Sequence, residues 1–245
     1  MPKSFDDPFL ILAHRGASRE APENTLAAFR RAFALGVDGI ELDVQLTADG
    51  ELIVIHDETV NRTTNGRGRV ERKTWAELQT LDAGTWFSEQ FAGERLPSLA
   101  QVLDEAEGVL VDVEIKKCRD SKLLKERLSA LIPPHKANAF LITSFDSSII
   151  EEFKTMRPDL RTGLLLNGRK KLAGSWEFVL PHHRLVDELF CARAAEAGKK
   201  IIVWTVDEEK DVNRLLQLGV GRFITNEPQK VQKIVQTAKN GLTLI

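Results

Sequence analysis

The chain has 245 residues, with 34 lysines and arginines against 36 aspartates and glutamates, so its formal net charge is −2 and its pI is near 6.3. Hydrophobic residues make up 42% and charged residues 29% of the chain, which is usual for a folded domain and excludes a disordered or fibrous protein. A strongly basic surface is typical of proteins that bind the phosphate backbone, so the balanced charge argues against a nucleic-acid partner. This length fits one large domain or two small ones.

The two cysteines, Cys118 and Cys191, are far apart in the sequence and form no CxxC motif. We expect both to be free thiols in a reducing compartment, and we place the protein in the cytoplasm. The first apolar run, 9–13, is far shorter than a signal-peptide core, and no later segment has the roughly 18 apolar residues of a membrane helix. The sequence therefore predicts no integral membrane segment, and it gives no indication of the oligomeric state.

The chain begins with a strand pattern and a helix pattern. The apolar run 9–13 lacks helical periodicity and predicts a buried strand that ends in a polar loop. A helix is predicted after Pro22, because Asn24 and Thr25 are start signals and apolar residues then recur at helical spacing. Gly36 is the predicted stop.

Two further strand patterns follow with almost no connection between them. Residues 38–47 alternate between apolar and polar, which predicts a strand with Glu41 and Asp43 on the same face. The strand pattern 52–55 comes only four residues later, so the link is either a hairpin or a helix-free crossover. Both alternatives bring His56 close to the two carboxylates.

Turn-forming and charged residues dominate 57–97, which we interpret as an insertion that forms a cap or small lobe after the third strand. Helix and strand patterns alternate again from Ser98 onward. Helices are predicted over 98–107, 120–131, 147–158, 186–198 and 209–219, and strands over 109–116, 139–145, 161–166, 177–181, 199–206 and 222–228. The stretch between the strands 161–166 and 177–181 is open between helix and irregular structure.

This alternation predicts an α/β fold with a parallel sheet, either a closed eight-stranded TIM-type (β/α)8 barrel or a doubly wound open sheet. We favour the barrel, because its mouth gathers the carboxyl ends of all its strands. Polar or aromatic residues suited to chemistry stand at several such ends, namely His14, Asp43, His56, Glu114, Lys116 and Trp204. No GxGxxG motif opens the first helix to indicate a dinucleotide site.

Three carboxylates stand in strand patterns that are otherwise apolar. They are Glu41 and Asp43 in the strand 38–47 and Glu114 in the strand 109–116. Carboxylates that converge at a barrel mouth repel each other unless a cation neutralises them, and oxygen ligands select hard ions such as Mg²⁺ or Ca²⁺ over zinc. The alternative is that each acid forms a salt bridge with nearby lysines or arginines.

His14 and His56 each end an apolar strand pattern and each precede a charged residue. Because an unperturbed histidine has a pKa near 6.5, two histidines facing each other can act as a base and an acid. The alternative for either one alone is a hydrogen-bonded packing residue. The remaining histidines lack carboxylate companions, and we expect them to be structural or surface residues: His135, His182 and His183.

Positive charge lies beside the same strand ends. Arg15 offers a planar fork that suits a phosphate and Lys116 offers a point charge, so together they indicate an anionic substrate. The alternative is simple salt bridging to the three acids. Trp204, and the pair Trp86 and Phe87 in the insertion, can form apolar walls for the rest of a substrate or pack in the core.

Several motifs carry a resemblance to a known family: HRG at 14–16, PENT at 22–25, GIELDVQLTADGELIVIHD at 39–57, RTTNGRG at 62–68, LDAGTWF at 81–87, VEIK at 113–116 and VWTV at 203–206. In this order they resemble the glycerophosphodiester phosphodiesterase family over almost the whole chain. The resemblance implies a single domain over 1–245, a TIM-type barrel with a small inserted lobe. It also implies hydrolysis of small-molecule glycerophosphodiesters, such as glycerophosphocholine or glycerophosphoethanolamine, to sn-glycerol 3-phosphate and an alcohol.

The resemblance also implies roles for the candidate residues. Glu41, Asp43 and Glu114 match the family's ligands for Mg²⁺ or Ca²⁺, His14 and His56 match its acid–base pair, and Arg15 and Lys116 match its phosphate-contacting residues. In the implied mechanism one histidine deprotonates the neighbouring glycerol hydroxyl, which attacks phosphorus, while the other protonates the leaving alcohol. Water then opens a cyclic phosphate. Which histidine is the first base stays open.

One stretch departs from the family pattern. Where the family usually has D-G-I-x-T-D-x-P, residues 221–228 are GRFITNEP, so we expect a rim of different shape or charge and an effect on substrate preference. Two alternative functions stay open. One is a phospholipase-type phosphodiesterase that acts on lysophospholipids, and the other is a barrel that binds a phosphorylated ligand without catalysis.

Overall fold

The computed structural model describes residues 3–168 and 172–242. Among these residues, eight parallel strands pair in the order β8-β7-β6-β5-β4-β2-β1-β9. An isolated parallel bridge between Val203 and Phe223 then joins the chain beyond β8 to β9, so the barrel is nearly closed. The eight strands are β1 (Phe9–His14), β2 (Gly39–Leu46), β4 (Leu110–Ile115), β5 (Phe140–Ser144), β6 (Arg161–Leu166), β7 (Phe178–Pro181), β8 (Lys200–Ile201) and β9 (Gly221–Thr225).

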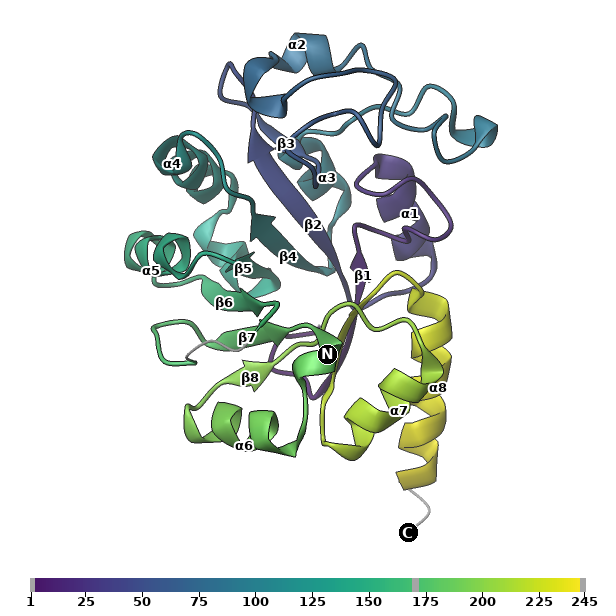
Figure 1. Cartoon of the computed structure of the whole chain (residues 1–245), viewed down its shortest axis with the longest axis vertical. Coiled ribbons are helices and arrows are strands. Elements are labelled where there is room, and N and C mark those ends of the chain that lie inside the picture. Colours follow the sequence, from purple (N-terminus) through teal and green to yellow (C-terminus); the bar gives the residue numbers. More distant parts are fainter. Residues whose placement is uncertain (1–2, 169–171, 243–245) are drawn as a thin grey trace.

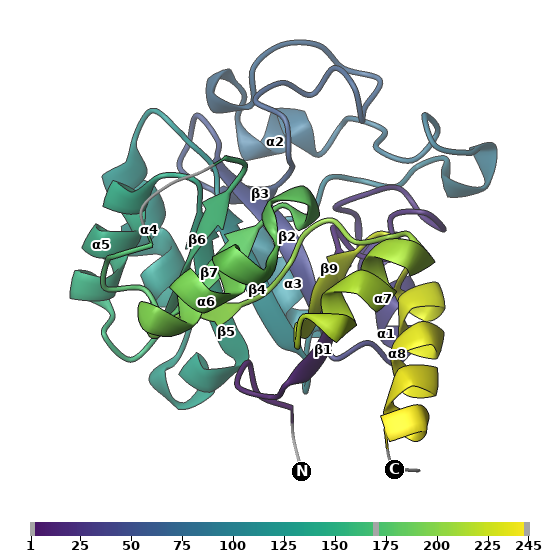
Figure 2. The ribbon, with the colours of Figure 1, turned by 60° about the horizontal axis from the view of Figure 1, so that its bottom comes forward.

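Helices alternate with these strands and surround them (Figures 1 and 2). They are α1 (Leu26–Ala34), α3 (Leu99–Glu105), α4 (Ser121–Leu131), α5 (Ser147–Met156), α6 (Glu188–Glu196), α7 (Glu209–Gln217) and α8 (Pro228–Leu242). Short 3₁₀ turns at Pro134–Ala139 and His183–Leu185 precede β5 and α6. The arrangement confirms the predicted TIM-type barrel.

The third strand pattern forms a hairpin and lies outside the barrel path. β3 (Leu52–Val54) pairs antiparallel with β2, with Val44 opposite Val54. The hairpin resolves the choice between hairpin and crossover, and it brings His56 back to β2, because Ile55 N donates to Asp43 O at 2.9 Å.

The predicted insertion 57–97 follows β3 and contains only short helical turns: Val70–Arg72, α2 (Trp75–Leu78) and Glu89–Phe91. Figures 1 and 2 show it beyond β2 and β3, on the opposite side of the molecule from the C-terminal end of α8. It shares a small apolar core with β3, made of Ile53, Ile55, Val60, Val70, Leu78, Ala83 and Leu96. Its first residues therefore stay close to the ends of β2 and β3.

Two elements near the C-terminus differ from the sequence-based expectation. The strand expected over 199–206 is regular only in β8, because beyond Ile201 the chain bonds alternately to β7 and β9 through single bridges. The helix α8 was not predicted, although Val231, Ile234 and Val235 have helical spacing and pack against α7.

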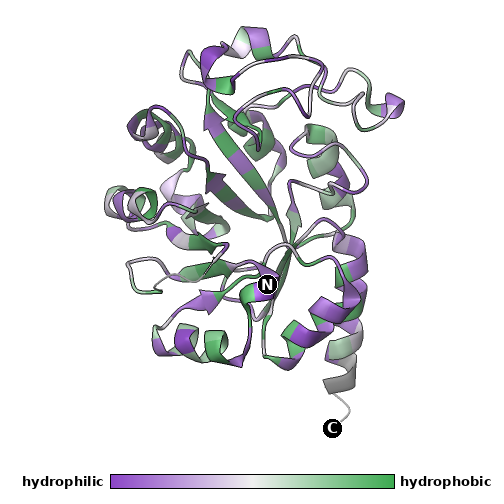
Figure 3. Cartoon of the chain, viewed as in Figure 1, coloured by the Kyte–Doolittle hydropathy of each residue, from purple (hydrophilic) through white to green (hydrophobic). Residues whose placement is uncertain are grey.

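Side chains along each strand alternate between the barrel interior and the helix layer. On β4, Leu110 belongs to an interior cluster, whereas Val111 and Val113 pack in the cluster shared with α1, α3 and α4. Asp112 and Glu114 therefore point into the barrel, above Leu110. The same alternation is visible as bands of green and purple along β2 in Figure 3.

The end of the barrel opposite the insertion is filled by the N-terminal segment. Phe5 is fully buried in the interior cluster and contacts Phe178 edge to face at 6.2 Å between ring centroids. Asp6 pairs with Arg161 and Lys200 at the start of β6 and β8. The interior is thus a packed core with a polar mouth at one end only.

Both cysteines are free thiols, as expected. None of the described helices combines the length and the apolar character that a membrane-spanning helix needs.

Candidate active site

The site is built on the pairing of β2 with β4. Asp43 lies opposite Glu114 and Glu41 lies opposite Asp112, so two layers of facing carboxylates enter the barrel from neighbouring strands. All four are at least nine-tenths buried. Oxygen atoms of Glu41, Asp43 and Glu114 lie within 4.8 Å of one another, which confirms the predicted convergence of these three side chains.

The HRG turn after β1 places two groups beside these acids. Arg15 has φ 56° and Gly16 has φ 80°, so the chain turns sharply and donates the Arg15 N–H to Glu41 Oε2 at 3.1 Å. A Cβ at Gly16 would lie 2.6 Å from the Ala28 carbonyl carbon, which only glycine avoids. Backbone strain of this kind is typical of functional sites.

Two cations flank the outer carboxylate layer. Lys116 Nζ donates to Glu114 Oε1 at 2.6 Å and lies 3.1 Å from Asp43 Oδ1, and Arg15 Nε lies 3.2 Å from Asp43 Oδ2. Asp43 is buried, which by itself raises its pKa, but Lys116 and Arg15 outweigh burial and hold this pKa well below its usual range. The structure therefore shows the salt bridges that were the alternative for these acids, and they bring the candidate phosphate-contacting residues Arg15 and Lys116 into one cluster with the acids.

The other carboxylates respond in the opposite way. Burial, followed by the charge of Asp43, raises the pKa of Glu41 well above its usual value and that of Glu114 to about 7. Burial raises the pKa of Asp112 to about 8. The site therefore holds protons that a bound cation can displace.

His14 is held by a network that reaches across to β9. Its Nδ1 lies 2.7 Å from Asn226 Oδ1, and Asn226 Nδ2 donates to Asp207 Oδ2 at 2.7 Å. Because that second bond fixes the amide with its oxygen toward the ring, His14 Nδ1 carries the proton, and Nε2, which lies 3.8 Å from Glu41 Oε2, carries the lone pair that can accept one. Burial and the Arg15 guanidinium lower the pKa of His14 to about 4.

His56 is held by a carboxylate instead of an amide. Its Nδ1 lies 2.7 Å from Asp57 Oδ1, and Arg62 donates to the same carboxylate from Nε at 2.7 Å. Burial lowers the pKa of His56, while Asp43 and Asp57 act against this effect. The two histidines thus differ in their partners: a neutral amide for His14 and an ion pair for His56.

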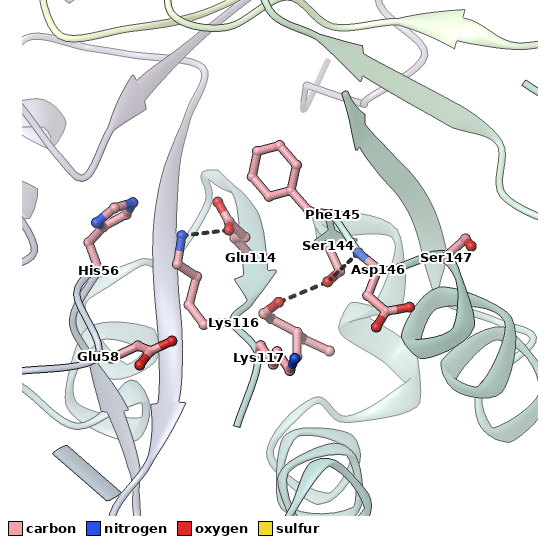
Figure 4. Close-up of a pocket in the computed structure, with 10 residues that line it drawn as sticks. His56, Glu58, Glu114, Lys116, Lys117, Ser144, Phe145, Asp146 and Ser147 are labelled. Atoms are coloured by element: carbon pink, nitrogen blue, oxygen red, sulfur yellow. Dashed lines mark hydrogen bonds and ion pairs between the residues drawn. The ribbon is translucent and has the colours of Figure 1, made fainter. Parts of the chain in front are cut away.

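Two cavities meet at these residues. The inner cavity has a volume of about 200 Å³ and is lined by His14, Arg15, Glu41, His56, Asp112, Glu114, Lys116, Thr143, Phe145, Leu165, Trp204, Thr205 and Ile224. The outer cavity has a volume of about 470 Å³ and is lined by His56, Glu58, Glu114–Lys117 and Ser144–Ser147 (Figure 4). His56, Glu114 and Lys116 line both, whereas His14 lines only the inner one.

The aromatic candidates divide into two groups. Trp204 lines the inner cavity, where its Nε1 donates to Leu180 O at 2.6 Å and its ring packs edge-on against Phe145. Trp86 and Phe87 contact each other in the insertion and line neither cavity, so the structure does not bring them to the site.

The other three histidines are structural or surface residues, as expected. His135 is exposed, His182 packs against the Trp204 ring, and His183 lies beside Asp211.

Sequence reasoning missed several residues of the site. Asp112 is two positions before Glu114 and therefore on the same strand face, a signal that was present in VDVEIK. The sequence indicates only a rim position for Asn226, but the structure places it against His14, so the departure at this position bears on a histidine. The sequence indicates Asn24 only as a helix start and as part of the PENT motif, but in the structure its side chain donates to Asp43 at 2.9 Å.

Comparison with known proteins agrees with these features. The sequence profile of the glycerophosphoryl diester phosphodiesterase family matches residues 14–230. The chain is 40% identical to a glycerophosphodiester phosphodiesterase of Caldanaerobacter subterraneus subsp. tengcongensis, over 93% of this chain and 98% of that protein. It is 32% identical to a glycerophosphodiester phosphodiesterase of Bacillus subtilis, over 93% and 87% of the two chains.

Solved structures agree as well. The phosphodiesterase of Oleispira antarctica, in complex with the product sn-glycerol-3-phosphate, is 26% identical, with a TM-score of 0.83 over 93% of this chain and 96% of that one. The motifs, the barrel and these matches together confirm the family and the enzyme class expected from the sequence, and the chain belongs to the glycerophosphoryl diester phosphodiesterase family.

Proposed function

We propose that the protein hydrolyses glycerophosphodiesters, such as glycerophosphocholine or glycerophosphoethanolamine, to sn-glycerol 3-phosphate and an alcohol, with Mg²⁺ or Ca²⁺ as cofactor. The observation that carries the proposal is the meeting of two cavities at a cluster of acids and cations, with one histidine confined to the inner cavity and the other facing both. A diester has two substituents on one phosphate, and this arrangement offers a compartment for each. The product bound to the Oleispira antarctica relative supports the choice of substrate.

The donor set fits a divalent cation. Glu41, Asp43 and Glu114 offer only oxygen atoms, and these atoms lie within 4.8 Å of one another, which suits Mg²⁺ or Ca²⁺. A cation held there would stabilise the charge that develops on the phosphoryl oxygens. Arg15 and Lys116 contribute positive charge on the same side, and Arg15 can bind two phosphate oxygens with its planar fork.

We assign the roles of base and acid to the two histidines from their hydrogen-bond partners and their positions in the cavities. His14 has a low pKa and an unprotonated Nε2, so we assign it the removal of the proton from the glycerol hydroxyl next to the phosphate. His56 borders the outer cavity and has Asp57 behind it, which stabilises its protonated form, so we assign it the protonation of the leaving alcohol.

With these roles, the proposed reaction has two steps. The deprotonated hydroxyl forms a bond to phosphorus, the bond from phosphorus to the alcohol oxygen breaks, and that oxygen takes the proton of His56. Water next attacks the cyclic phosphate and opens it to sn-glycerol 3-phosphate, while the histidines exchange roles. Trp204 and Phe145 supply an apolar wall for the part of the substrate in the inner cavity.

The free thiols of both cysteines support a protein that works in a reducing compartment, and we propose that this compartment is the cytoplasm.

The test is the release of sn-glycerol 3-phosphate from glycerophosphocholine by the EDTA-treated protein, with Mg²⁺ and Ca²⁺ added back separately. We expect release to return with metal and to fall by about 10²-fold or more in His14→Ala and His56→Ala. His135→Ala is the matched control, because it makes the same change at an exposed histidine and is expected to keep full activity.

Other outcomes decide against the proposal. A phospholipase-type enzyme is indicated if the protein releases choline or phosphocholine from lysophosphatidylcholine in the presence of metal but does not hydrolyse glycerophosphocholine. Binding of sn-glycerol 3-phosphate without turnover of any diester indicates a barrel that only binds phosphorylated ligands.

A further inference from the structure

Asp112 is a buried carboxyl group that the proposed chemistry does not use. It is fully buried on β4, and its Oδ1 accepts a hydrogen bond from Thr143 Oγ1 at 2.8 Å. Its other oxygen, Oδ2, is buried without a hydrogen-bond partner among the described residues. A buried polar atom without a partner costs about 1–3 kcal/mol, so such an atom in a residue that lines a cavity, as Asp112 does, indicates a ligand group that completes it.

The position of Asp112 in the barrel fixes where that ligand group lies. Glu41 faces Asp112 one layer deeper than the pair Asp43 and Glu114, and Asp112 lines the inner cavity but not the outer one. The group it binds therefore belongs to the part of the substrate that enters deepest, beyond the phosphate at Arg15 and Lys116.

The size and lining of the inner cavity fit a small polyol. Water occupies roughly 30 Å³ per molecule, so about 200 Å³ equals the volume of about six water molecules, which is enough for a glycerol unit. Leu165, Trp204 and Ile224 offer an apolar wall for carbon-bound hydrogens, and Asp112 with Thr143 offers hydrogen-bonding atoms on the other side. Glycerol has three carbons and three hydroxyl oxygens, which matches both the size and the mixed lining.

We propose that Asp112 Oδ2 binds the terminal hydroxyl of the glycerol unit in the inner cavity and so selects glycerol among the alcohols that a phosphodiester can carry. The inference rests on the proposed function. A hydroxyl group both donates and accepts, so it satisfies this carboxyl group with or without its proton. A substrate without the terminal hydroxyl leaves Oδ2 buried and unpaired, and a site of this kind rejects such an analogue strongly.

The experiment compares two product ligands by calorimetric titration of the whole chain with saturating Mg²⁺. One ligand is sn-glycerol 3-phosphate and the other is its analogue without the terminal hydroxyl, 2-hydroxypropyl phosphate. We expect the wild type to bind the first about 10- to 100-fold more tightly. Asp112→Leu is expected to bind both equally, and Asp112→Asn, which keeps the shape and the hydrogen bonding, to restore part of the preference.

Thr162→Val is the matched control for damage to a barrel strand. Thr162 is fully buried on β6 and donates to Glu177, but it lines neither cavity, so this variant is expected to keep the wild-type preference. Circular dichroism and thermal unfolding show whether each variant is folded.

Three results overturn the inference: equal binding of both ligands by the wild type, an unchanged preference in folded Asp112→Leu, or an equal loss for both ligands in Asp112→Asn. Because the readout is binding of products, it does not depend on turnover. Failure of the proposed function appears instead as the absence of release from glycerophosphodiesters by the wild type.

Discussion

Exchanging Asn226 and Asp207 moves one negative charge next to His14 without changing the net charge. In the wild type, Asn226 Oδ1 lies 2.7 Å from His14 Nδ1, and the Asn226 amide donates to Asp207. The double variant Asn226→Asp, Asp207→Asn keeps this pair of hydrogen bonds, because the new amide at 207 can donate to the new carboxylate at 226. The amide oxygen of the new Asn at position 207 can still accept a hydrogen bond from Thr225 Oγ1, as the carboxylate of Asp207 does in the wild type. The perturbation is therefore one of charge position with little change in shape.

The size of the effect follows from the pKa of His14 and from Coulomb's law. Burial and Arg15 hold this pKa at about 4 in the wild type. Two unit charges about 4 Å apart attract by about 4 kcal/mol at an effective dielectric constant of about 20. In the wild type, Asp207 already attracts the His14 imidazolium from behind Asn226. We therefore take about half of this energy, about 2 kcal/mol, as the additional attraction in the double variant. Because 1.36 kcal/mol changes a proton equilibrium tenfold, a gain of about 2 kcal/mol raises the pKa of His14 by about 1.5, to between about 5 and 6.

The assay is the pH profile of kcat/KM for glycerophosphocholine at saturating Mg²⁺. If His14 is the first base, the acidic limb of the profile moves upward by about 1.5 pH units in the double variant. Asn226→Leu is the control, because it removes the acceptor without adding charge and is expected to lower the rate without an upward shift of this limb. An unmoved acidic limb in a folded, active double variant refutes the assignment of His14 as the base.

Three further predictions concern the metal site and the fold. Because the pKa of Glu114 is about 7, Mg²⁺ binding at pH 6 should release protons, seen as a buffer-dependent heat in calorimetry, and Glu114→Gln should release fewer. Phe5→Ala should lower the free energy of unfolding by about 3–5 kcal/mol in urea titrations, since this ring is fully buried in the barrel floor. Hydrogen bonds from Arg161 and Lys200 lower the pKa of Asp6, so its stabilisation is complete above its unfolded pKa and is lost as the pH falls through the lower folded value. Asp6→Asn should therefore destabilise by at most about 1 kcal/mol at pH 7, because the group is exposed, and by less at pH 3.

The fold was predictable because its signals are local. Buried strands appear as apolar runs, as in β1, and the period of two in β2 is enough by itself to place Glu41 and Asp43 on one face. The order of strands and helices then leaves a short choice of architectures. The convergence of the candidate residues follows from the barrel itself, since most of them stand at carboxyl ends of strands or just beyond, and Glu41 and Asp43 lie within β2 opposite residues of β4.

What the sequence did not reveal depends on register and on contacts between distant segments. That Asp112 faces Glu41 follows from the pairing of β2 with β4, which no local pattern contains. Asn226 reaches His14 across 212 positions of sequence, because β1 and β9 are neighbours in the barrel. For Trp86 and Phe87 the sequence leaves a substrate wall and packing as equal alternatives, and the structure decides for packing within the insertion.

The register of two strands also explains why identical chemical groups behave differently in this site. The outer carboxylates lie near the cations that follow β1 and β4: Asp43, between Arg15 and Lys116, keeps its charge, whereas burial raises the pKa of Glu114 to about 7. The inner pair lies one step deeper, where Glu41 accepts a backbone N–H and Asp112 accepts a hydroxyl, so burial dominates and the pKa of each rises. Glu41, Asp43 and Glu114 together suit a metal ion beside a charged phosphate, and Asp112, on the inner layer, suits a neutral hydroxyl group. A substrate that is an anion at one end and a polyol at the other matches this order of layers from the mouth of the barrel inward.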